Sequence, residues 1–548
     1  MNALRSPVTR GVLRSYGPLC GAALVFLLLA AFVQPLPREK QTVTSRGRGS
    51  TAVAVPGAQT GAGVTAGAGA TQSPGGTAAE ETGGTNASYY VPAGAQACSD
   101  RTVMIPNDPY SPPCYEFTGD NGGATSRGVT SDEIVVSIRE LEGPSAAEIF
   151  TSLSGEQVND SPESTKDTVI ALTEYFNQHF QFYGRKMRVE IFKGQGNGAS
   201  ELLGGAKEKA LADAIKVSDE IRAFVDLSGI TLPYANALSE QRVVNLGAPY
   251  PSRNWFVQRS PYAWSFFPDG TSVVEAHSAW IKARLVGSNA DYAGPAYQGK
   301  PRKYAVLAPE NAEYQESVQA YIAEVEKAGF EISLNLTYKL DLNSMPNQAS
   351  NIVAQLKDAG ITSVLAACDP VMLAIGLAPK ANEQDYQPEW ITAGLAFVDQ
   401  DIVSQLIDER QWGRAFGIAY NAEPEPLRSS LPYAAYKSVR PNDEPAFAFE
   451  LLYYQMYMLA IGLQMAGPNL TPESFEQGMF SYPGGLGALG SWKFGPGDYS
   501  GTDDVREIWW DPDRISIQNN KPGAWVQLNG GARYLPDQMP QGPAPFFQ

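Results

Sequence analysis

The segment Asp132-Glu133-Ile134-Val135-Val136-Ser137-Ile138 places a β-branched apolar run directly after a polar turn, and it begins a pattern that repeats along the chain. Each short apolar run is followed by a longer segment with the apolar spacing of an amphipathic helix. This alternation is typical of βαβ units, in which consecutive strands are parallel. The chain from Asp132 onward is therefore predicted to have an α/β fold with mostly parallel sheets.

The repeating pattern falls into two sets. The first set comprises strands at Ile134–Ile138, Met187–Phe192, Ala223–Leu227 and Val243–Leu246, and helices at Ser164–Phe182, Ala206–Ile221 and Tyr234–Glu240. The second comprises strands at Lys303–Ala308, Glu331–Tyr338, Ser363–Ala367, Trp390–Ala393 and Ala415–Tyr420, and helices at Ala312–Ala328, Pro346–Ala359, Val371–Ala381 and Asp399–Ile407. Two sets predict two lobes, as expected for 548 residues, which exceed one hydrophobic core. A helix at Ala446–Met465 and a strand pair near Arg506–Trp510 and Ala524–Leu528 are predicted to be crossovers and caps.

The charge of the chain argues against polyanionic partners. Its formal net charge is −17 at pH 7, and the first fifty residues are basic, so the acidic excess lies in the remainder. An acidic domain repels nucleic acid phosphates and anionic lipid surfaces. No nucleic acid partner is therefore expected.

The N-terminus has the features of a membrane signal. Arg5, Arg10 and Arg14 precede an uncharged stretch from Ser15 to Pro37, whose centre at Ala22–Val33 is almost wholly apolar. Such a stretch can span a bilayer as an uncleaved anchor, whereas a cleavable signal peptide would show a small-residue cleavage site after it. We interpret residues 1–41 as a cytoplasmic tail and transmembrane anchor, with cleavage as the alternative. Residues 42–96, rich in Gly, Ala and Thr, are predicted to form a disordered linker.

Two cysteines indicate the compartment of the folded part. Cys98 and Cys114 lie in a leader segment, residues 97–127, that has no helical periodicity. A disulfide between them is predicted, with two free thiols as the alternative, and such a bond persists only in an oxidising compartment. His179 and His277 are the only histidines in the chain, so no His/Cys cluster for a metal site is expected, and no cofactor is predicted.

Several motifs, in this order, resemble type I periplasmic binding proteins, in particular the branched-chain amino acid group of ABC-transporter substrate-binding proteins. They are Gly128–Val136, Leu141–Ala146, Val225–Gly229, Lys303–Leu307 with Glu310 and Tyr314 behind it, and Lys327–Glu331. The cysteine-containing leader is similar to that of actinobacterial members. The resemblance covers most of the chain after the leader.

The resemblance implies two flavodoxin-like lobes with parallel sheets, joined by hinge crossovers and closing on a small solute. Lobe I would comprise residues 128–262 and about 423–490, and lobe II residues 263–422 and about 491–535, followed by a flexible tail at 536–548. The closed form would be recognised by an ABC transporter permease. The alternatives to this importer function are a membrane-tethered sensor acting through a partner protein and a cell-envelope enzyme. A catalytic set is difficult to assemble with two histidines, so the chain is not expected to be an enzyme.

In open parallel sheets the ligand lies beyond the carboxyl ends of the strands, so binding residues are expected in the loops that follow strands. Carried over position by position, the resemblance implies the ligand-binding candidates Glu140, Glu142, Ser228, Gly229, Ala248, Tyr250, Tyr314, Asp369 and Gly394. Ser228 would bind a ligand carboxylate, Tyr250 or Tyr314 would stack or hydrogen-bond, and Asp369 would face an ammonium group.

Structural roles compete with these binding roles. Ser228 and Asp369 are common helix-cap residue types, and Tyr314 can be a packed aromatic in its helix. Acidic residues on the predicted cleft side favour a cationic or polar ligand: Glu140, Glu142, Glu310, Glu313 and Asp369.

Overall fold

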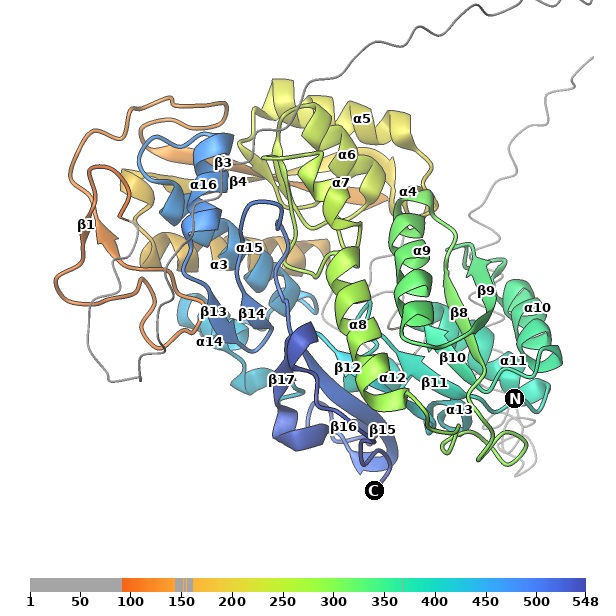
Figure 1. Ribbon diagram of the computed structural model, residues 1–548. Helices are drawn as coiled ribbons and strands as arrows, with labels where there is room; N and C mark the ends of the chain where they lie inside the picture. The colour runs from red at the N-terminus through yellow and green to blue at the C-terminus, as the bar shows by residue number, and fades with distance from the viewer. Residues whose placement is uncertain (1–90, 143–150, 152–153, 155–160, 368) are drawn as a thin grey trace, which may run out of the picture. The chain divides into compact units, whose positions relative to one another are not determined.

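A computed structural model describes residues 91–142, 151, 154, 161–367 and 369–548 (Figure 1). The described residues belong to one compact unit that begins at Tyr89. The predicted anchor and nearly all of the predicted linker lie outside the described residues. Among the helices that the structure describes, none combines the length and apolar character needed to cross a bilayer.

The first sheet has five parallel strands in the order β4-β3-β5-β6-β7. The strands are β3 (Glu133–Glu142), β4 (Lys186–Asn197), β5 (Val225–Asp226), β6 (Val244–Leu246) and β7 (Ala263–Trp264). Val136, Val225 and Val244 are fully buried, as expected for parallel strands that helices cover on both faces. The opening run at Ile134–Ile138 thus lies in a strand, as predicted, and this strand is an inner one of the sheet.

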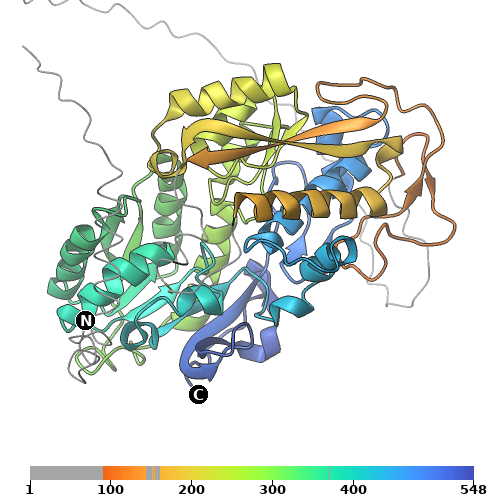
Figure 2. The same cartoon turned by 180° about the vertical axis from the view of Figure 1, so that it is seen from behind.

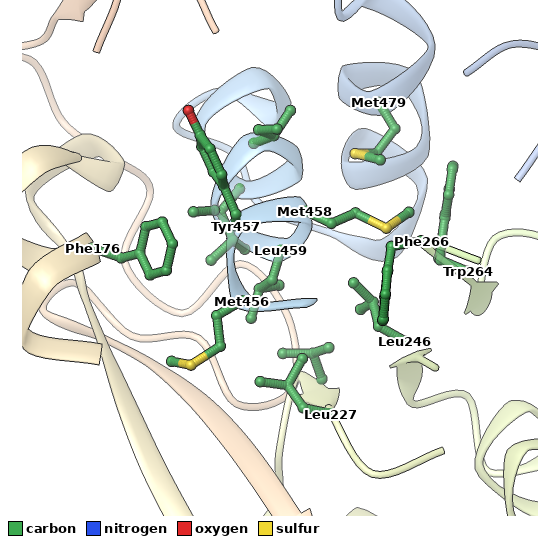
Figure 3. Packing of buried hydrophobic residues seen from close by; sticks show 14 of the residues in the cluster. Phe176, Leu227, Leu246, Trp264, Phe266, Met456, Tyr457, Met458, Leu459 and Met479 are labelled. Atoms are coloured by element: carbon green, nitrogen blue, oxygen red, sulfur yellow. The ribbon is translucent and has the colours of Figure 1, made fainter. Parts of the chain in front are cut away.

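Two layers of helices cover the first sheet. On one face lie α3 (Pro162–His179), seen from behind in Figure 2, and α15 (Phe449–Ala466). Figure 3 shows Tyr457 and Leu459 of α15 between Phe176 of α3 and the strand residue Leu246. The other face is covered by α5 (Lys207–Ile215) and α6 (Leu232–Glu240).

The second sheet has eight strands, in the order β16-β15-β12-β11-β10-β8-β9 with β17 beside β15. Its parallel strands are β8 (Tyr304–Pro309), β9 (Ile332–Tyr338), β10 (Ser363–Ala366), β11 (Glu389–Thr392) and β12 (Ala415–Ala419). Antiparallel strands extend it at one side: β15 (Val505–Ile515), β16 (Pro522–Gln527) and β17 (Arg533–Tyr534). The predicted strand pair therefore continues the second sheet.

The second sheet is also covered on both faces. One face packs against α8 (Gly270–Leu285) and α9 (Ala312–Lys327). The other packs against α10 (Met345–Asp358), the π-helical turn η4 (Met372–Leu377) that continues into α11 (Ala378–Glu383), and α13 (Glu409–Trp412). Each sheet has its own hydrophobic cores, which confirms the predicted two-lobed α/β fold.

Three features differ from the sequence-based expectations. Strand β7 and the buried side chains of Trp492 and Tyr499 belong to the core of the first lobe, which therefore extends beyond the predicted boundaries at 262 and 490. The segment predicted as a flexible tail packs Phe546, 2% exposed, against Trp280 and Phe416. Burial of this apolar aromatic group explains the difference.

The long helix α8 was not among the predicted helices. It is buried along most of its length, so it lacks the polar face that marks an amphipathic helix. Its N-terminus does carry a recognisable signal, because the Asp269 side chain accepts a hydrogen bond from the backbone N–H of Ser272 at 2.7 Å.

The leader contains the predicted disulfide between Cys98 and Cys114. It also holds the short antiparallel pair β1 (Gln96–Ala97) and β2 (Tyr115–Glu116). Tyr110 anchors the leader, because its hydroxyl donates to the carbonyl of Gly490 at 2.7 Å and its own carbonyl accepts from the Tyr482 hydroxyl at 2.8 Å. The leader is thus packed against the helix α16 (Pro472–Ser481) and the hairpin of β13 (Gly485–Gly487) and β14 (Gly490–Trp492).

We expect the double substitution Cys98→Ser with Cys114→Ser to lower the free energy of unfolding by about 3 kcal/mol, because it opens a loop of this size in the unfolded chain. Urea unfolding under oxidising conditions measures the difference, and the reduced wild-type chain is the matched comparison. An unchanged unfolding midpoint would contradict a stabilising disulfide.

Candidate functional site

A cavity of about 560 Å³ lies at the carboxyl ends of strands in the second sheet. The strands β8, β10 and β11 end at this edge, and α8 and α9 form one wall. Pro249 and Tyr250, which follow β6 of the first lobe, form part of the opposite wall. The cavity is therefore lined by both lobes, at the edge where parallel sheets bind ligands.

Small residues at the ends of the strands make room for the cavity. Ala308 lies near the end of β8, Ala367 follows β10 and Ala393 follows β11. The remaining walls are mainly apolar and include Val273 and Val274 of α8 and Val318 of α9. A mostly apolar concave site with a few polar groups is the usual form of a small-molecule binding site.

The two lobes approach each other closely beside the cavity at Gly270, the first residue of α8. A Cβ atom at this position would lie 2.3 Å from Oγ of Ser317 and 2.6 Å from the carbonyl oxygen of Tyr250. A side chain on residue 270 would therefore push α8, α9 and the first-lobe loop apart. Glycine here lets these three segments meet around the cavity.

The most deeply buried ionisable group in the cavity wall is His277 of α8. Its Nδ1 lies 2.8 Å from the Tyr321 hydroxyl, while its Nε2 is buried with no hydrogen-bond partner among the described residues. Burial penalises the charged imidazolium and lowers the pKa of His277 to about 3. His277 is therefore a neutral hydrogen-bonding group at neutral pH.

Tyr250 links the lobes across the cavity. Its hydroxyl accepts a hydrogen bond from the backbone N–H of Ala396 at 2.9 Å, and its ring lies 5.7 Å from that of Phe267 between centroids. Burial raises the pKa of the Tyr250 phenol, so it remains protonated and can donate its hydrogen to a ligand or to water. Tyr314 also lines the cavity, from the first turn of α9.

Asp369 lines the cavity but is already engaged as a helix cap. Its Oδ1 accepts from the backbone N–H groups of Val371 and Met372, each at 2.9 Å, and the Tyr338 hydroxyl donates to its Oδ2. Burial raises the pKa of the Asp369 carboxyl. The capping role considered from the sequence is therefore present, whereas its pairing with a ligand ammonium stays a prediction.

Among the other predicted ligand residues, those whose side chains the structure describes do not line this cavity. Ser228 donates to Oδ1 of the buried Asp226 at 2.6 Å, and its Oγ accepts from the backbone N–H of Arg139. Gly229 packs against Asn245, and Ala248 is buried in the first-lobe core. Ser228 thus makes hydrogen bonds within the first lobe, and its contact with a ligand carboxylate stays a prediction.

The remaining predicted positions are near strand ends. Glu140 is exposed on β3, Glu142 is the last residue of that strand, and Gly394 lies between the lining residues Ala393 and Leu395. Of the acidic residues that favoured a cationic or polar ligand, Glu310 and Glu313 also lie outside the lining. Asp369 is the one acidic residue among the described residues that line the cavity, and the preference for a cationic or polar ligand stays a prediction.

Polar side chains already occupy the corresponding edge of the first sheet. Nε2 of Gln455 donates to the carbonyl of Leu227 at 2.5 Å and to that of Leu246 at 2.7 Å, just beyond β5 and at the end of β6. Nearby, Arg139 is buried in ion pairs with Glu201 and Asp213. These interactions satisfy first-lobe groups that a ligand would otherwise contact.

Sequence reasoning missed His277, Ser317 and Tyr321, which lie on the helices α8 and α9 rather than in loops that follow strands. No periodicity marks His277 as a wall residue, because α8 is buried on nearly every side. The N-cap residue Asp269 was the available signal for the helix, although it says nothing about the cavity.

Two parallel α/β lobes that enclose a cavity at the ends of their strands define a two-lobed solute-binding protein. The chain belongs to the periplasmic binding protein family, whose model matches residues 149–507. This is a family of solute-binding proteins rather than enzymes, and the predicted family resemblance is confirmed. No curated protein is similar to the chain in sequence.

Solved structures of low sequence identity share the fold. A solute-binding protein of an ABC transporter from R. palustris, in complex with 4-hydroxybenzoate, is 12% identical with a TM-score of 0.52, over 75% of this chain and 98% of that one. One from Rhodopseudomonas palustris BisB5, in complex with 3,4-dihydroxybenzoic acid, is 13% identical with a TM-score of 0.53, over 74% and 97%. A leucine-, isoleucine-, valine-, threonine- and alanine-binding protein from Brucella ovis is 12% identical with a TM-score of 0.52, over 74% and 96%.

We expect His277→Phe to remove part of the acid sensitivity of the fold. Because the pKa of His277 is about 3 in the folded chain and 6.5 ordinarily, the unfolded chain binds the extra proton. The contribution of neutral His277 to the free energy of unfolding is fully present above pH 6.5 and is lost as the pH falls toward 3. Between pH 7 and pH 4 the loss is about 3 kcal/mol.

Urea unfolding at pH 7, 5.5 and 4 measures this loss, with the substitution of the other histidine, His179→Phe, as the matched control. If His277→Phe and the wild-type chain lose stability equally on acidification, His277 is not buried in its neutral form.

Proposed function

We propose that this protein is an extracytoplasmic solute-binding protein that captures a small solute in the cavity between its lobes and delivers it to an ABC transporter permease. The observation that carries the proposal is the cavity itself, which lies at the carboxyl ends of β8, β10 and β11 and is covered by Tyr250 of the opposite lobe. Membership of the periplasmic binding protein family supports the same function.

A small set of polar contacts supports closure around a solute. Besides the bond between Tyr250 and Ala396, the Ser252 hydroxyl donates to Oε2 of Glu316 at 2.7 Å. Nδ2 of Asn311 donates to the carbonyl of Leu202 at 2.8 Å. These bonds join the two lobes beside the cavity, and each contributes only about 1 kcal/mol. Such contacts can break and form again as the lobes open and close.

The proposed location is the outer face of the membrane. The disulfide between Cys98 and Cys114 fits an oxidising compartment. We propose that the N-terminal segment of residues 1–41 anchors the chain and that residues 42–96 tether the lobes to it. In this arrangement the permease, which is embedded in the same membrane, receives solute from a protein that stays within reach.

The direct test is to identify the solute. The chain is purified without added ligand and denatured, and the released small molecules are identified by mass spectrometry. Thermal unfolding is then measured with the released compound and with a panel of amino acids, aromatic carboxylates, sugars and polyamines. Stabilisation by at least one solute is expected, and none across the released compound and the whole panel would contradict the proposed function.

Filling the cavity is expected to abolish solute binding. Val274→Phe adds volume at the wall formed by α8, and we expect it to weaken binding of the released solute at least 100-fold because the space is lost. Val286→Phe is the matched control, since Val286 is 54% exposed and does not line the cavity. Isothermal titration calorimetry measures both, and unchanged affinity in Val274→Phe would place the solute elsewhere.

Closure is expected to depend on the hydroxyl of Tyr250. Tyr250→Phe keeps the ring but removes the acceptor for the Ala396 N–H, so the closed state becomes less stable by about 1 kcal/mol. We expect about fivefold weaker solute binding, measured by calorimetry. Tyr433→Phe, which removes a hydroxyl that faces Glu444 away from the cavity, serves as the control. Equal affinities of the two variants would contradict the closure contact.

A further inference from the structure

Few ionisable groups lie among the described residues that line the cavity. Of the described residues that line it, none is a lysine or an arginine. Its ionisable side chains are those of His277 and Asp369, together with the tyrosines Tyr250, Tyr314 and Tyr321. The other lining side chains are mainly apolar, among them Val306 of β8, Leu340 and Leu395, which follow strands, and Met345, the first residue of α10.

Neither His277 nor Asp369 supplies a free charge to the cavity. Burial keeps His277 neutral, so it cannot pair with a carboxylate. The Asp369 carboxyl is engaged by Tyr338 and by the first backbone N–H groups of the helix it caps. A carboxylate entering this cavity would lose its hydration without gaining a cationic partner from the described wall, and the one acidic group of that wall, Asp369, already accepts three hydrogen bonds.

Two neutral polar atoms in the wall are left without partners. His277 is 1% exposed, and its Nε2 has no hydrogen-bond partner in the described part of the chain. Ser317 Oγ, one helix away on α9, is likewise buried and unpaired there. Buried polar atoms of this kind normally have a hydrogen-bond partner. A solute in the cavity that both residues line can supply one.

The tautomer of His277 makes this group adaptable. When the Tyr321 hydroxyl donates to Nδ1, the imidazole carries its hydrogen on Nε2 and offers a donor to the cavity. In the other tautomer Nδ1 donates to Tyr321 and Nε2 is an acceptor. A hydroxyl group can serve both forms, because it donates and accepts, whereas a carbonyl group requires the first.

We propose that this cavity binds an uncharged solute with a largely apolar body and one hydroxyl or carbonyl group that hydrogen-bonds to His277 Nε2, with Ser317 as the second polar contact. This inference rests on the proposed function and specifies its solute class. The volume of about 560 Å³ fits such a body, since small-molecule sites commonly span about 300–1,000 Å³. An α-amino acid in its zwitterionic form is not the solute of this site.

The test uses the full chain and probes that share one ring system and differ in one group. The probes are 2-naphthol, which is neutral with a hydroxyl group, naphthalene, which has none, and 2-naphthoate, which is charged. L-Leucine is the zwitterionic probe. We expect 2-naphthol to bind about tenfold more tightly than naphthalene, as one neutral hydrogen bond allows, and at least 100-fold more tightly than 2-naphthoate or L-leucine in calorimetry at pH 7.

Variants assign the hydrogen bond to His277. His277→Phe is expected to remove the tenfold preference for 2-naphthol over naphthalene, so that the two probes bind with about equal affinity. His277→Gln, which keeps a hydrogen-bonding amide, should restore part of the difference. His179→Phe is the matched control and should bind 2-naphthol as the wild-type chain does. If His277→Phe and the wild-type chain prefer 2-naphthol over naphthalene by the same factor, the proposed role of His277 is overturned.

The remaining outcomes separate the inference from the proposed function. Preferred binding of 2-naphthoate or L-leucine overturns the inference and leaves the solute-binding function intact. Failure of all four probes to bind also overturns the inference, and the proposed function is then decided by the compound released from the purified chain. A released compound that is neutral and mainly apolar supports both proposals, whereas a released amino acid or carboxylate supports only the function.

Discussion

The arrangement of this protein depends on the constraint that parallel strands end at a common edge. Each lobe has a core of parallel strands that is buried on both faces, so helices cover the faces and the connecting loops gather at the edges. The polar backbone groups at those edges need partners. How each lobe supplies them decides where a ligand can bind.

The two lobes meet this requirement in different ways. In the first lobe, Gln455 bonds to the carbonyls of Leu227 and Leu246, and the buried Arg139 pairs with Glu201 and Asp213. In the second lobe, alanines at the strand ends leave space that α8 and α9 enclose with mainly apolar side chains. The resulting site lies mainly in the second lobe, and the first lobe contributes a cover through Tyr250. A solute that has an apolar body and few polar groups fits a site built mainly from the apolar walls of the second lobe.

The strands were predictable because their apolar, β-branched runs are short and follow turn residues, as at Ile134–Ile138 and Lys303–Ala308. The site was predictable only in part. Tyr250, Tyr314 and Asp369 line the cavity because they follow strands and the common-edge rule applies to them. Ser228 obeys the same rule but is engaged by Asp226, and a hydrogen bond between two side chains leaves no mark in the sequence. His277 lies on a helix that is buried on nearly every side, which hides it from periodicity.

The sequence by itself determined the two-lobed α/β fold, the pairing of Cys98 with Cys114 and the family. Each of these rests on local patterns and spacing, which can be recognised without knowing the tertiary contacts. Only the tertiary structure decided what the cavity wall is made of. The wall joins residues far apart in the chain, such as Tyr250, His277 and Ala396, and their neutral, mainly apolar character depends on burial. Burial is a property of the packed chain, so the chemistry of the site could not be derived from the order of residues alone.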